Sequence, residues 1–409
     1  MKTATQVLFV IVGYAMLSGA NGASAQDWPQ WRGPNRDGKA MGFHAPATWP
    51  KELNQKWRVT VGDGVATPAL VDDKLYIFTR QDGNEIIRCL NAVTGEENWQ
   101  DKYPAEGVRG PASGFSGPRS SPTVVGRKVV TFGVQGTLSC LDAATGTKLW
   151  RKTEFQDSLP RFSTSCSPIA VNGVCIVQLG GERNGAIVGY DLATGDEKWR
   201  WTGDGTAYAS PVLLSLDDAV EIVAETAGSI VGLSVADGKL LWQVPFVAQG
   251  RAYNAATPIV DGATVIFSGA GRGVRAVAIE KQGDELAAKE LWSTKDNGVQ
   301  FNTPILKNGL VFGISDRDML FCINTQNRQT AWTSKTDGSR GYGSVVDAGS
   351  VLVALTPGGM LHFFEPSDKE YKELASYKVA ENGTYAYPII SGKRVFIKDK
   401  DAVTLWVIE

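Results

Sequence analysis

Cysteine and histidine are scarce in this sequence, which limits the metal and redox chemistry that the protein could carry. The 409 residues include 5 Cys and 2 His. No two cysteines are adjacent, and no Cys-x-x-Cys-His motif for haem attachment is present. The two histidines, His44 and His362, lie far apart, and neither belongs to a Glu-x-x-His motif. We therefore expect no metal site and no catalytic residue built on histidine.

A basic excess and long apolar runs are also missing from most of the chain. The formal net charge of −2 disfavours a nucleic-acid partner, and beyond the N-terminus no stretch is apolar enough to cross a bilayer. At the N-terminus, Lys2 precedes the apolar segment 6–17, and Ala23-Ser24-Ala25 resembles a cleavage site. These features predict a signal peptide over residues 1–25, cleaved after Ala25, and a secreted or periplasmic protein. An N-terminal membrane anchor is the alternative.

Eight repeated units fill the rest of the sequence. Each unit begins with a short motif that is followed by an apolar run, a polar turn and a second apolar run. The opening pairs are Thr67-Pro68, Ser121-Pro122, Ser167-Pro168, Ser210-Pro211, Thr257-Pro258, Thr303-Pro304, the divergent Ser344-Val345, and Tyr387-Pro388. Proline is tolerated at the first residue of a strand. Dipeptides such as Asn172-Gly173, Asp261-Gly262 and Asn308-Gly309 favour hairpin turns, so each unit is expected to be a small antiparallel sheet.

A second motif closes most of these units. Asp142-Ala-Ala-Thr-Gly146 precedes Trp150, and related loops precede other tryptophans, whereas Tyr377 takes this place in the seventh unit. The Asp side chain can bond the local backbone, and Gly accepts a positive φ. We expect each Trp to lie on an outer strand and to pack between neighbouring units. The predicted docking residues are Trp57, Trp99, Trp150, Trp199, Trp242, Trp292 and Trp332.

The cysteines fit this repeat as buried strand residues. Cys89, Cys140 and Cys322 occupy the same place in three different units, where Cys behaves as a small apolar residue. Cys166 and Cys175 flank one hairpin, but a turn at Asn172-Gly173 sets Cys175 opposite Ala170. A disulfide between these two cysteines is therefore disfavoured.

The two ends of the repeat region predict how the units close on one another. The last unit stops at Ile408 without an outer strand, and the segment 55–61, which contains Trp57, supplies a strand of the missing type. We predict an all-β fold: an eight-bladed β-propeller of four-stranded antiparallel blades, closed by pairing the N-terminal strand into the last blade. The propeller spans residues 55–409, residues 26–54 form an N-terminal leader, and the protein is expected to be a monomer.

The repeat resembles that of a known family. A Pro-headed strand followed by Asp-Ala-x-Thr-Gly-x-x-x-Trp is similar to the tryptophan-docking repeat of quinoprotein alcohol dehydrogenases and of the BamB propellers of outer-membrane assembly, over about residues 55–409. The leader Asp27-Trp-Pro-Gln-Trp-Arg-Gly-Pro-Asn-Arg-Asp-Gly38 resembles that of bacterial secreted proteins with propellers of the pyrroloquinoline-quinone-like type. The resemblance implies the fold and an exported location, but one fold hosts many activities.

The cofactor of the dehydrogenases is not supported by the residues present. The family resemblance implies a quinone held between a disulfide of adjacent cysteines and a Trp, with a calcium ion on acidic and amide side chains. This sequence has no adjacent cysteines. We therefore predict no cofactor and no catalytic residue, with pyrroloquinoline quinone and calcium as the alternative. The segment 269–273, which is rich in glycine, is expected to be a turn between strands rather than a phosphate loop.

A set of arginine and aromatic residues recurs just before the strand that opens each unit. Three residues before the Pro of the opening pair, or before Val345 in the divergent unit, stand Arg119, Tyr208, Phe301, Tyr342 and Tyr385, and nearby lie Arg161, Phe162, Arg251, Tyr253, Asn254, Asn302 and Arg340. In a propeller these positions should converge on one mouth of the central channel. Arg and Tyr are enriched at binding hot spots, and Arg pairs with carboxylates. These residues either fill the channel or contact a ligand or partner.

Three classes of function remain on the sequence alone. The favoured class is a non-catalytic binding or scaffolding propeller, similar to BamB, whose partner is an envelope or extracellular protein. The second is a quinone-dependent oxidoreductase with a reduced site. The third is a propeller that binds glycans or small anions in its funnel. The sequence names neither the partner nor the ligand.

Overall fold

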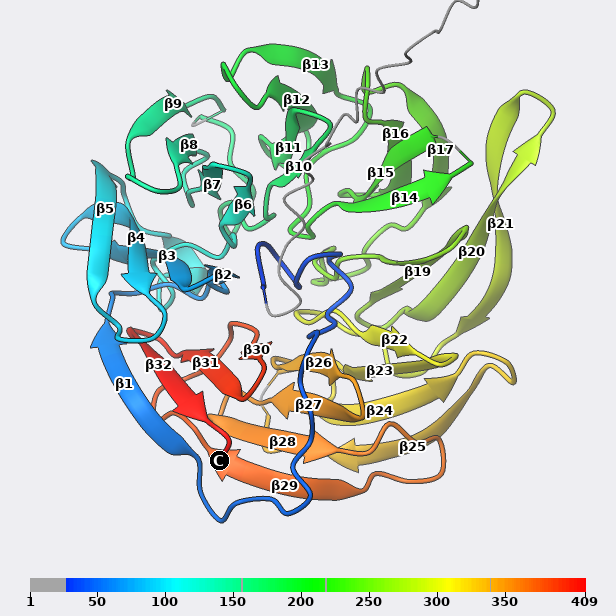
Figure 1. The fold of residues 1–409 in the computed structure, drawn as a ribbon. Helices are drawn as coiled ribbons and strands as arrows, with labels where there is room; N and C mark the ends of the chain where they lie inside the picture. Colours follow the sequence, from blue (N-terminus) through cyan, green and yellow to red (C-terminus); the bar gives the residue numbers. More distant parts are fainter. Residues whose placement is uncertain (1–26, 156, 218, 339) are drawn as a thin grey trace, which may run out of the picture.

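The computed structural model describes residues 27–155, 157–217, 219–338 and 340–409. Eight separate four-stranded sheets, each antiparallel, stand around a central axis (Figure 1). The predicted eight-bladed propeller is confirmed. The signal peptide predicted for residues 1–25 lies outside the described residues. Within the described ranges, the helical segment is a single 3-10 turn, η1 (Gly110–Ala112).

Seven blades are built from consecutive strands, numbered from the inner strand outward. Blades 1 to 3 consist of β2 (Ala69–Val71), β3 (Lys74–Gln81), β4 (Asn84–Asn91) and β5 (Glu97–Pro104); β6 (Thr123–Val125), β7 (Lys128–Phe132), β8 (Leu138–Asp142) and β9 (Lys148–Lys152); and β10 (Ile169–Val171), β11 (Val174–Leu179), β12 (Ala186–Asp191) and β13 (Glu197–Trp201). Blades 4 and 5 consist of β14 (Val212–Leu216), β15 (Ala219–Glu225), β16 (Ser229–Ser234) and β17 (Leu240–Pro245); and β18 (Ile259–Asp261), β19 (Thr264–Gly269), β20 (Gly273–Gln282) and β21 (Glu285–Thr294). Blades 6 and 7 consist of β22 (Ile305–Lys307), β23 (Leu310–Ile314), β24 (Met319–Asn324) and β25 (Gln329–Lys335); and β26 (Ser344–Ala348), β27 (Val351–Leu355), β28 (Met360–Phe364) and β29 (Glu373–Lys378).

Blade 8 joins the two ends of the chain. It consists of β30 (Ile389–Ser391), β31 (Arg394–Lys398) and β32 (Ala402–Val407), with β1 (Asn54–Thr60) as its outer strand. β1 pairs antiparallel with β32, so that Trp57 lies opposite Leu405 and Arg58 opposite Thr404. The predicted closure by the N-terminal strand is confirmed.

Two of the three predicted hairpin turns lie at the predicted dipeptides, and the third is shifted by one residue. Asn172 and Gly173 have φ of 49° and 75°, and Asn308 and Gly309 have φ of 52° and 76°, which suits a two-residue turn with both residues left-handed. Asp261, however, is the last residue of β18 and pairs with Thr264, so the turn there is Gly262-Ala263. As expected, Cys175 lies opposite Ala170, and all five cysteines are free and buried.

The tryptophans of the outer strands contact the loop of the next blade. The indole nitrogen of Trp99 donates to Ala143 O at 3.2 Å, that of Trp150 to Leu192 O at 3.2 Å, and that of Trp199 to Val235 O at 2.9 Å. Each acceptor follows the first residue of the neighbouring closing loop. The glycine of that loop lies against the ring: a Cβ on Gly195 would be 2.8 Å from Trp150 Cδ2. Glycine therefore suits the loop both by its positive φ and by the space it leaves for indole.

Three other tryptophans do not make the contact described for Trp99, Trp150 and Trp199. Trp242 donates at 2.8 Å to the carboxylate of Glu221 in its own blade, because blade 5 continues into the long hairpin β20–β21 instead of a tight loop (Figure 1). Trp332 donates to Ser367 O at 2.7 Å, and Trp292 is buried. Trp57 of β1 donates to Ala92 O of blade 1 at 3.3 Å, so the closing strand contacts the first blade in the same way.

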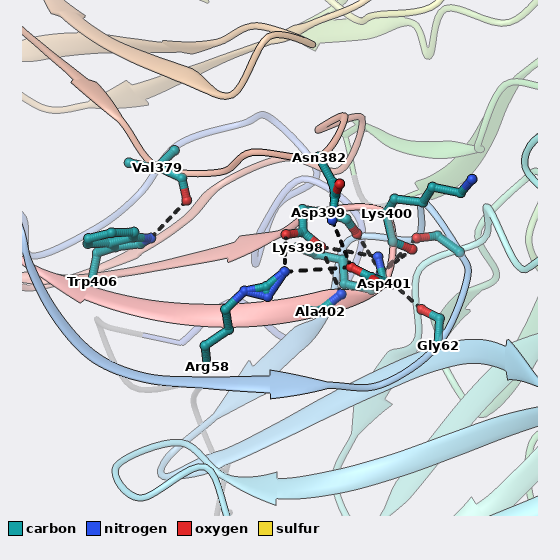
Figure 2. Close-up of polar contacts among 11 residues, drawn as sticks. Arg58, Gly62, Val379, Asn382, Lys398, Asp399, Lys400, Asp401, Ala402 and Trp406 are labelled. Atoms are coloured by element: carbon teal, nitrogen blue, oxygen red, sulfur yellow. Dashed lines mark hydrogen bonds and ion pairs between the residues drawn. The ribbon is translucent and has the colours of Figure 1, made fainter.

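A buried lysine holds the closure of the ring together (Figure 2). The ammonium of Lys398, at the end of β31, donates to Gly64 O at 2.9 Å and Asp399 O at 2.6 Å, and also reaches Gly62 O and Lys400 O. Arg58 of β1 donates to the buried Asp399 carboxylate at 2.9 Å. The segment that follows β1 is thereby fixed to the β31–β32 turn.

The Lys398 ammonium makes the stability of the closure depend on pH. Burial lowers the pKa of Lys398 to about 8, although Asp399, Asp63 and Asp401 oppose the shift. An unfolded lysine titrates near pH ~10.4, so above about pH 8 the unfolded chain binds more protons and the fold gains stability as pH rises. We expect the melting temperature of the wild type, relative to Lys398→Met, to rise by roughly 2 °C or more between about pH 7.5 and 9.5.

The control for this pH effect is Lys400→Met, which removes an exposed lysine from the same turn. This variant should keep the pH dependence of the wild type. If the melting temperatures of the wild type and of Lys398→Met changed in parallel over the window, Lys398 would not be the responsible group.

The leader does not lie apart from the ring. We expected residues 26–54 to form a segment separate from the propeller, but residues 27–40 lie inside the central channel (Figure 1, dark blue). The side chains of Trp28, Arg32 and Arg36 are buried there. From the channel the chain runs past blades 7 and 8 to β1, with Trp49 packing on Phe363 at 4.6 Å between ring centroids. One end of the channel is thus occupied by the chain itself.

Candidate binding face at the channel mouth

The inner ends of the blades are tied to one another by hydroxyl groups of their opening motifs. The backbone NH of Ser121 donates to Ser167 Oγ at 2.9 Å, and that of Ser167 to Ser210 Oγ at 2.8 Å. The series continues through Thr257 and Thr303. Tyr387, in the opening motif of blade 8, continues the series past blade 7. Its hydroxyl accepts from Thr303 N of blade 6 at 3.0 Å, and its own NH donates to Thr67 Oγ1 of blade 1 at 2.9 Å. These bonds fix the loops that precede the inner strands.

The loops carry a continuous chain of aromatic side chains just before the inner strands begin. The ring centroids of neighbouring members are separated by 4.7 Å for Phe115 and Tyr385, 5.1 Å for Tyr385 and Tyr342, and 4.1 Å for Tyr342 and Phe301. The chain continues from Phe301 to Tyr253 at 5.9 Å, and from there to Phe162 and Tyr208. All seven side chains are half-buried. We call this set the aromatic ring: Phe115, Phe162, Tyr208, Tyr253, Phe301, Tyr342 and Tyr385.

Arg119 joins the two ends of the aromatic ring. Its guanidinium donates to Phe115 O at 3.1 Å and to Phe162 O at 3.2 Å. Burial lowers the pKa of Arg119, while Tyr342 and the carboxylate of Asp63 act in the opposite direction. Among the described residues no carboxylate forms an ion pair with Arg119. Its positive charge is therefore not neutralised by a paired acid.

Three further arginines surround the aromatic ring with exposed side chains. Arg161 lies 5.2 Å from the centroid of the Phe162 ring. Arg251 and Arg340 are exposed, and in the described ranges neither forms an ion pair with Asp or Glu. Arg340 has a φ of 60°, which is uncommon for a residue other than glycine. Among the described residues, none of the four predicted arginines forms an ion pair with a carboxylate, and their contact with a ligand stays a prediction.

Two of the predicted residues lie beneath the mouth instead of on it. Asn254 is buried, and its amide donates to Thr226 O at 2.8 Å and Phe246 O at 3.0 Å. Asn302 is buried, and its amide donates to Ile314 O at 2.6 Å. Both satisfy backbone carbonyls, and the structure gives them a bracing role. The remaining predicted residues are exposed or half-buried: Arg119, Arg161, Phe162, Tyr208, Arg251, Tyr253, Phe301, Arg340, Tyr342 and Tyr385.

Two residues outside the predicted set also belong to this region. Phe115 completes the aromatic ring, but it lies in the long loop after β5, where counting back from Ser121-Pro122 does not find it. Arg272 comes from the turn at residues 269–273, which joins strands as expected. Its guanidinium stacks 3.8 Å from the Phe246 centroid and donates to Asn254 Oδ1 at 2.7 Å. The isolated Arg between glycines was the only sequence signal for this brace.

The described residues do not fit the quinone and calcium of the alternative function. The five cysteines lie in separate strands or loops with no adjacent pair, and burial raises the pKa of Cys140, Cys166 and Cys322 to about 12. Within the described ranges no three His, Cys, Asp or Glu side chains are grouped to hold a metal ion. His362 is in β28 and contacts Glu373 at 2.7 Å on the surface of blade 7. We derive no step through a quinone.

The chain is similar in sequence to two groups of known proteins. A family model described as outer membrane protein assembly factor BamB matches residues 83–334. The BamB of Burkholderia pseudomallei is 23% identical over 367 residues, which cover 86% of this chain and 86% of that protein. The quinohemoprotein alcohol dehydrogenase of Comamonas testosteroni is 28% identical over 196 residues, 44% of this chain but 26% of that enzyme.

Solved structures show the same fold. The crystal structure of BamB from Moraxella catarrhalis has a TM-score of 0.66 at 17% identity and covers 87% of this chain and 100% of that chain. The Comamonas dehydrogenase has a TM-score of 0.70 at 15% identity and covers 95% of this chain and 81% of that chain. In the part of the chain that is described, no helix has the length and apolar character of a membrane span. The relatives thus divide into assembly factors and dehydrogenases.

Proposed function

Because this chain belongs to the family of the outer membrane protein assembly factor BamB, we propose that it is a non-catalytic, exported propeller that binds a protein partner through the mouth of its channel. The match to the family model over residues 83–334 establishes the membership. The exported location rests on the signal peptide predicted for residues 1–25. The single observation that carries the proposed binding face is the aromatic ring with Arg119 between its ends.

The aromatic ring has the composition and rigidity of a binding hot spot. Tyr, Phe and Arg supply large contact area with few rotatable bonds, so little side-chain entropy is lost when a partner covers them. Stacking of Phe301 on Tyr342, with an angle of 7° between their planes, holds both rings in place before binding. The hydroxyl bonds beneath the loops add a rigid frame. A partner would therefore meet a preformed surface.

The charge of the mouth indicates which kind of partner segment would fit. Arg161, Arg251 and Arg340 are exposed cations around the aromatic ring, and Arg119 adds a fourth within it. Arginine pairs with carboxylates through two parallel hydrogen bonds. We therefore propose that the partner contributes a segment in which acidic residues alternate with apolar or aromatic ones. This chemistry favours a polypeptide over a glycan, since sugars carry few carboxylates.

The experiment that tests the proposed function is capture of partners by a double variant. Arg251→Ala with Arg340→Ala should weaken partner capture from an envelope extract by roughly 30-fold, because hot-spot arginines each contribute about 1 kcal/mol or more. The salt dependence of capture should fall as well, since two rim charges are lost. A photocrosslinking residue at position 342 identifies the segment that contacts the mouth.

The matched control removes the same charge elsewhere. Arg127→Ala with Arg328→Ala takes two exposed arginines from the β6–β7 and β24–β25 turns and should leave capture unchanged. Equal capture by the wild type and both double variants would mean that the mouth is structural and that binding uses another surface. Retention of added pyrroloquinoline quinone with calcium, measured by absorbance after gel filtration, would instead favour the oxidoreductase.

A further inference from the structure

The segment 27–40 contacts every blade of the propeller from within the channel. Trp28 pairs with Leu70 of blade 1, and Pro29 O accepts from Val124 of blade 2 at 2.8 Å. Gly38 and Ala40 bond Asp347 of blade 7. The side chains of Trp31, Arg32 and Arg36 reach the other five blades, through Ser167, Pro168, Pro211, Thr257, Thr303, Pro304 and Tyr387. Blades otherwise contact mainly their neighbours, so this segment links blades that never touch.

The two arginines of the segment are held by backbone carbonyls. The Arg36 guanidinium donates to Pro211 O at 2.8 Å, to Ser167 O at 3.3 Å and to Pro168 O. Its Nε donates to Gln30 of the same segment at 2.9 Å. Arg32 donates to Thr303 O at 2.8 Å and Pro304 O at 2.9 Å. Both side chains are almost completely buried, at 1% exposed for Arg32 and 3% for Arg36.

Five of the acceptors are carbonyls of the ring, and Gln30 Oε1 and Asp37 O of the leader add two more. The five ring carbonyls are those of the opening Ser-Pro and Thr-Pro motifs, which converge on the axis because each begins an inner strand. Among the described residues, neither arginine forms an ion pair with a carboxylate. Burial therefore lowers the pKa of both guanidiniums. The carbonyls act as a cage with several acceptors in different directions, which suits the planar, multidentate guanidinium better than an ammonium.

The backbone of the segment is shaped to present these side chains. Arg32 and Arg36 have φ of 60° and 58°, the left-handed region that residues with a Cβ rarely adopt. The segment forms two consecutive turns. Gly33 N donates to Gln30 O at 3.0 Å in the first turn, and Arg36 N donates to Gly33 O at 3.2 Å in the second. Such strain persists where the surroundings over-determine the conformation, as at ligand clamps. Trp31 adds an indole bond to Thr257 Oγ1 at 3.1 Å and an edge contact with Tyr387.

We propose that the axial channel is a recognition site for an arginine-bearing peptide turn, and that residues 27–40 are its resident occupant. The class of ligand is a short peptide of the pattern Trp-Arg-x-x-x-Arg in a double turn, bound through guanidinium to backbone carbonyls. The segment meets the sheets only through the isolated bridges Trp28–Leu70 and Lys39–Asp347, and the linker that follows it is exposed at Ala47 and Thr48. This site lies on the axis, on the side of the hydroxyl bonds away from the aromatic ring, and does not depend on the proposed function of the mouth.

The test uses the full mature chain with a protease site inserted between Ala47 and Thr48. After cleavage, the fragment that ends at Ala47 should remain bound through gel filtration without a covalent link. Labelled synthetic peptide of residues 27–47, added in excess, should replace it over time, as followed by fluorescence anisotropy. A peptide carrying Arg36→Ala should compete at least ~100-fold more weakly, because its cage carbonyls lose their donor inside the protein.

The control peptide carries Lys39→Ala, which removes an exposed cation of the same segment and should compete like the wild type. A peptide with Arg36→Lys should fall between the two, since one ammonium cannot reach all the acceptors. Loss of the fragment on cleavage, unfolding of the cleaved protein, or refusal of added peptide would each overturn the proposal. Equal competition by the Arg36→Ala and Lys39→Ala peptides would overturn recognition by guanidinium.

Discussion

Replacing the seven residues of β1 with a Gly-Ser linker of the same length is expected to abolish cooperative folding of the closed ring. The change removes the strand that pairs with β32 and with it Trp57, whose indole contacts blade 1. β32 would then present a row of unpaired backbone groups, a known route to aggregation. The expected result is a lower and broader thermal transition with soluble oligomers, measured by calorimetry and light scattering. Keeping the linker length leaves residues 27–40 able to reach the channel.

The control separates pairing from the local ion pair. Arg58→Ala keeps the strand and removes only the ion pairs of Arg58 with Asp399 and Asp401. Because the Arg58 side chain is partly exposed, this single change should cost about 1 kcal/mol or less of unfolding free energy. A monomeric linker variant that melted like the wild type would contradict the closure as a source of stability, whatever the register of β1 and β32.

Trp150→Ala and Trp199→Ala should each lower the free energy of unfolding by about 3–5 kcal/mol. Both side chains are buried between two blades, and each loses a hydrogen bond to the next blade as well as its contact with a loop glycine. The truncated side chain leaves a cavity that the four-stranded sheets cannot close without shifting. Chemical denaturation monitored by circular dichroism measures the loss.

Trp201→Ala is the matched control for the docking position. Trp201 lies on the same strand as Trp199, two residues further along, but is only half-buried. Its truncation should cost clearly less, about 1–2 kcal/mol, in proportion to the smaller area that it buries. If Trp199→Ala cost no more than Trp201→Ala, the indole would not be docking between blades.

The fold could be predicted because its signals are local and repeated. Pro68 and its counterparts directly precede the inner strand in seven of the eight units, and Asn172-Gly173 places a turn where only a two-residue hairpin fits. The register of that hairpin also follows from the turn, which is why Cys175 faces Ala170. Tyr377 could be recognised as a substitute for Trp because its neighbours kept their spacing. Its hydroxyl donates to Pro50 O.

The candidate site could be predicted only in part. The position three residues before the Pro of the opening motif, or before Val345, is fixed by the start of the inner strand, so counting found Arg119, Phe301 and Tyr342. The count could not tell which neighbours face the mouth. Asn254 and Asn302 turn inward because buried carbonyls need a donor there, and no sequence pattern marks an unpaired carbonyl.

The sequence by itself determined the number of blades, the docking tryptophans and the closing strand. Each of these follows from a motif read within one unit or from the comparison of one unit with the next. The tertiary structure alone decided what fills the channel. Arg32 and Arg36 bond carbonyls that lie more than a hundred residues away in the chain, at 131 to 272 positions of separation. Those carbonyls become neighbours only when eight inner strands converge on one axis, and no local pattern records that convergence.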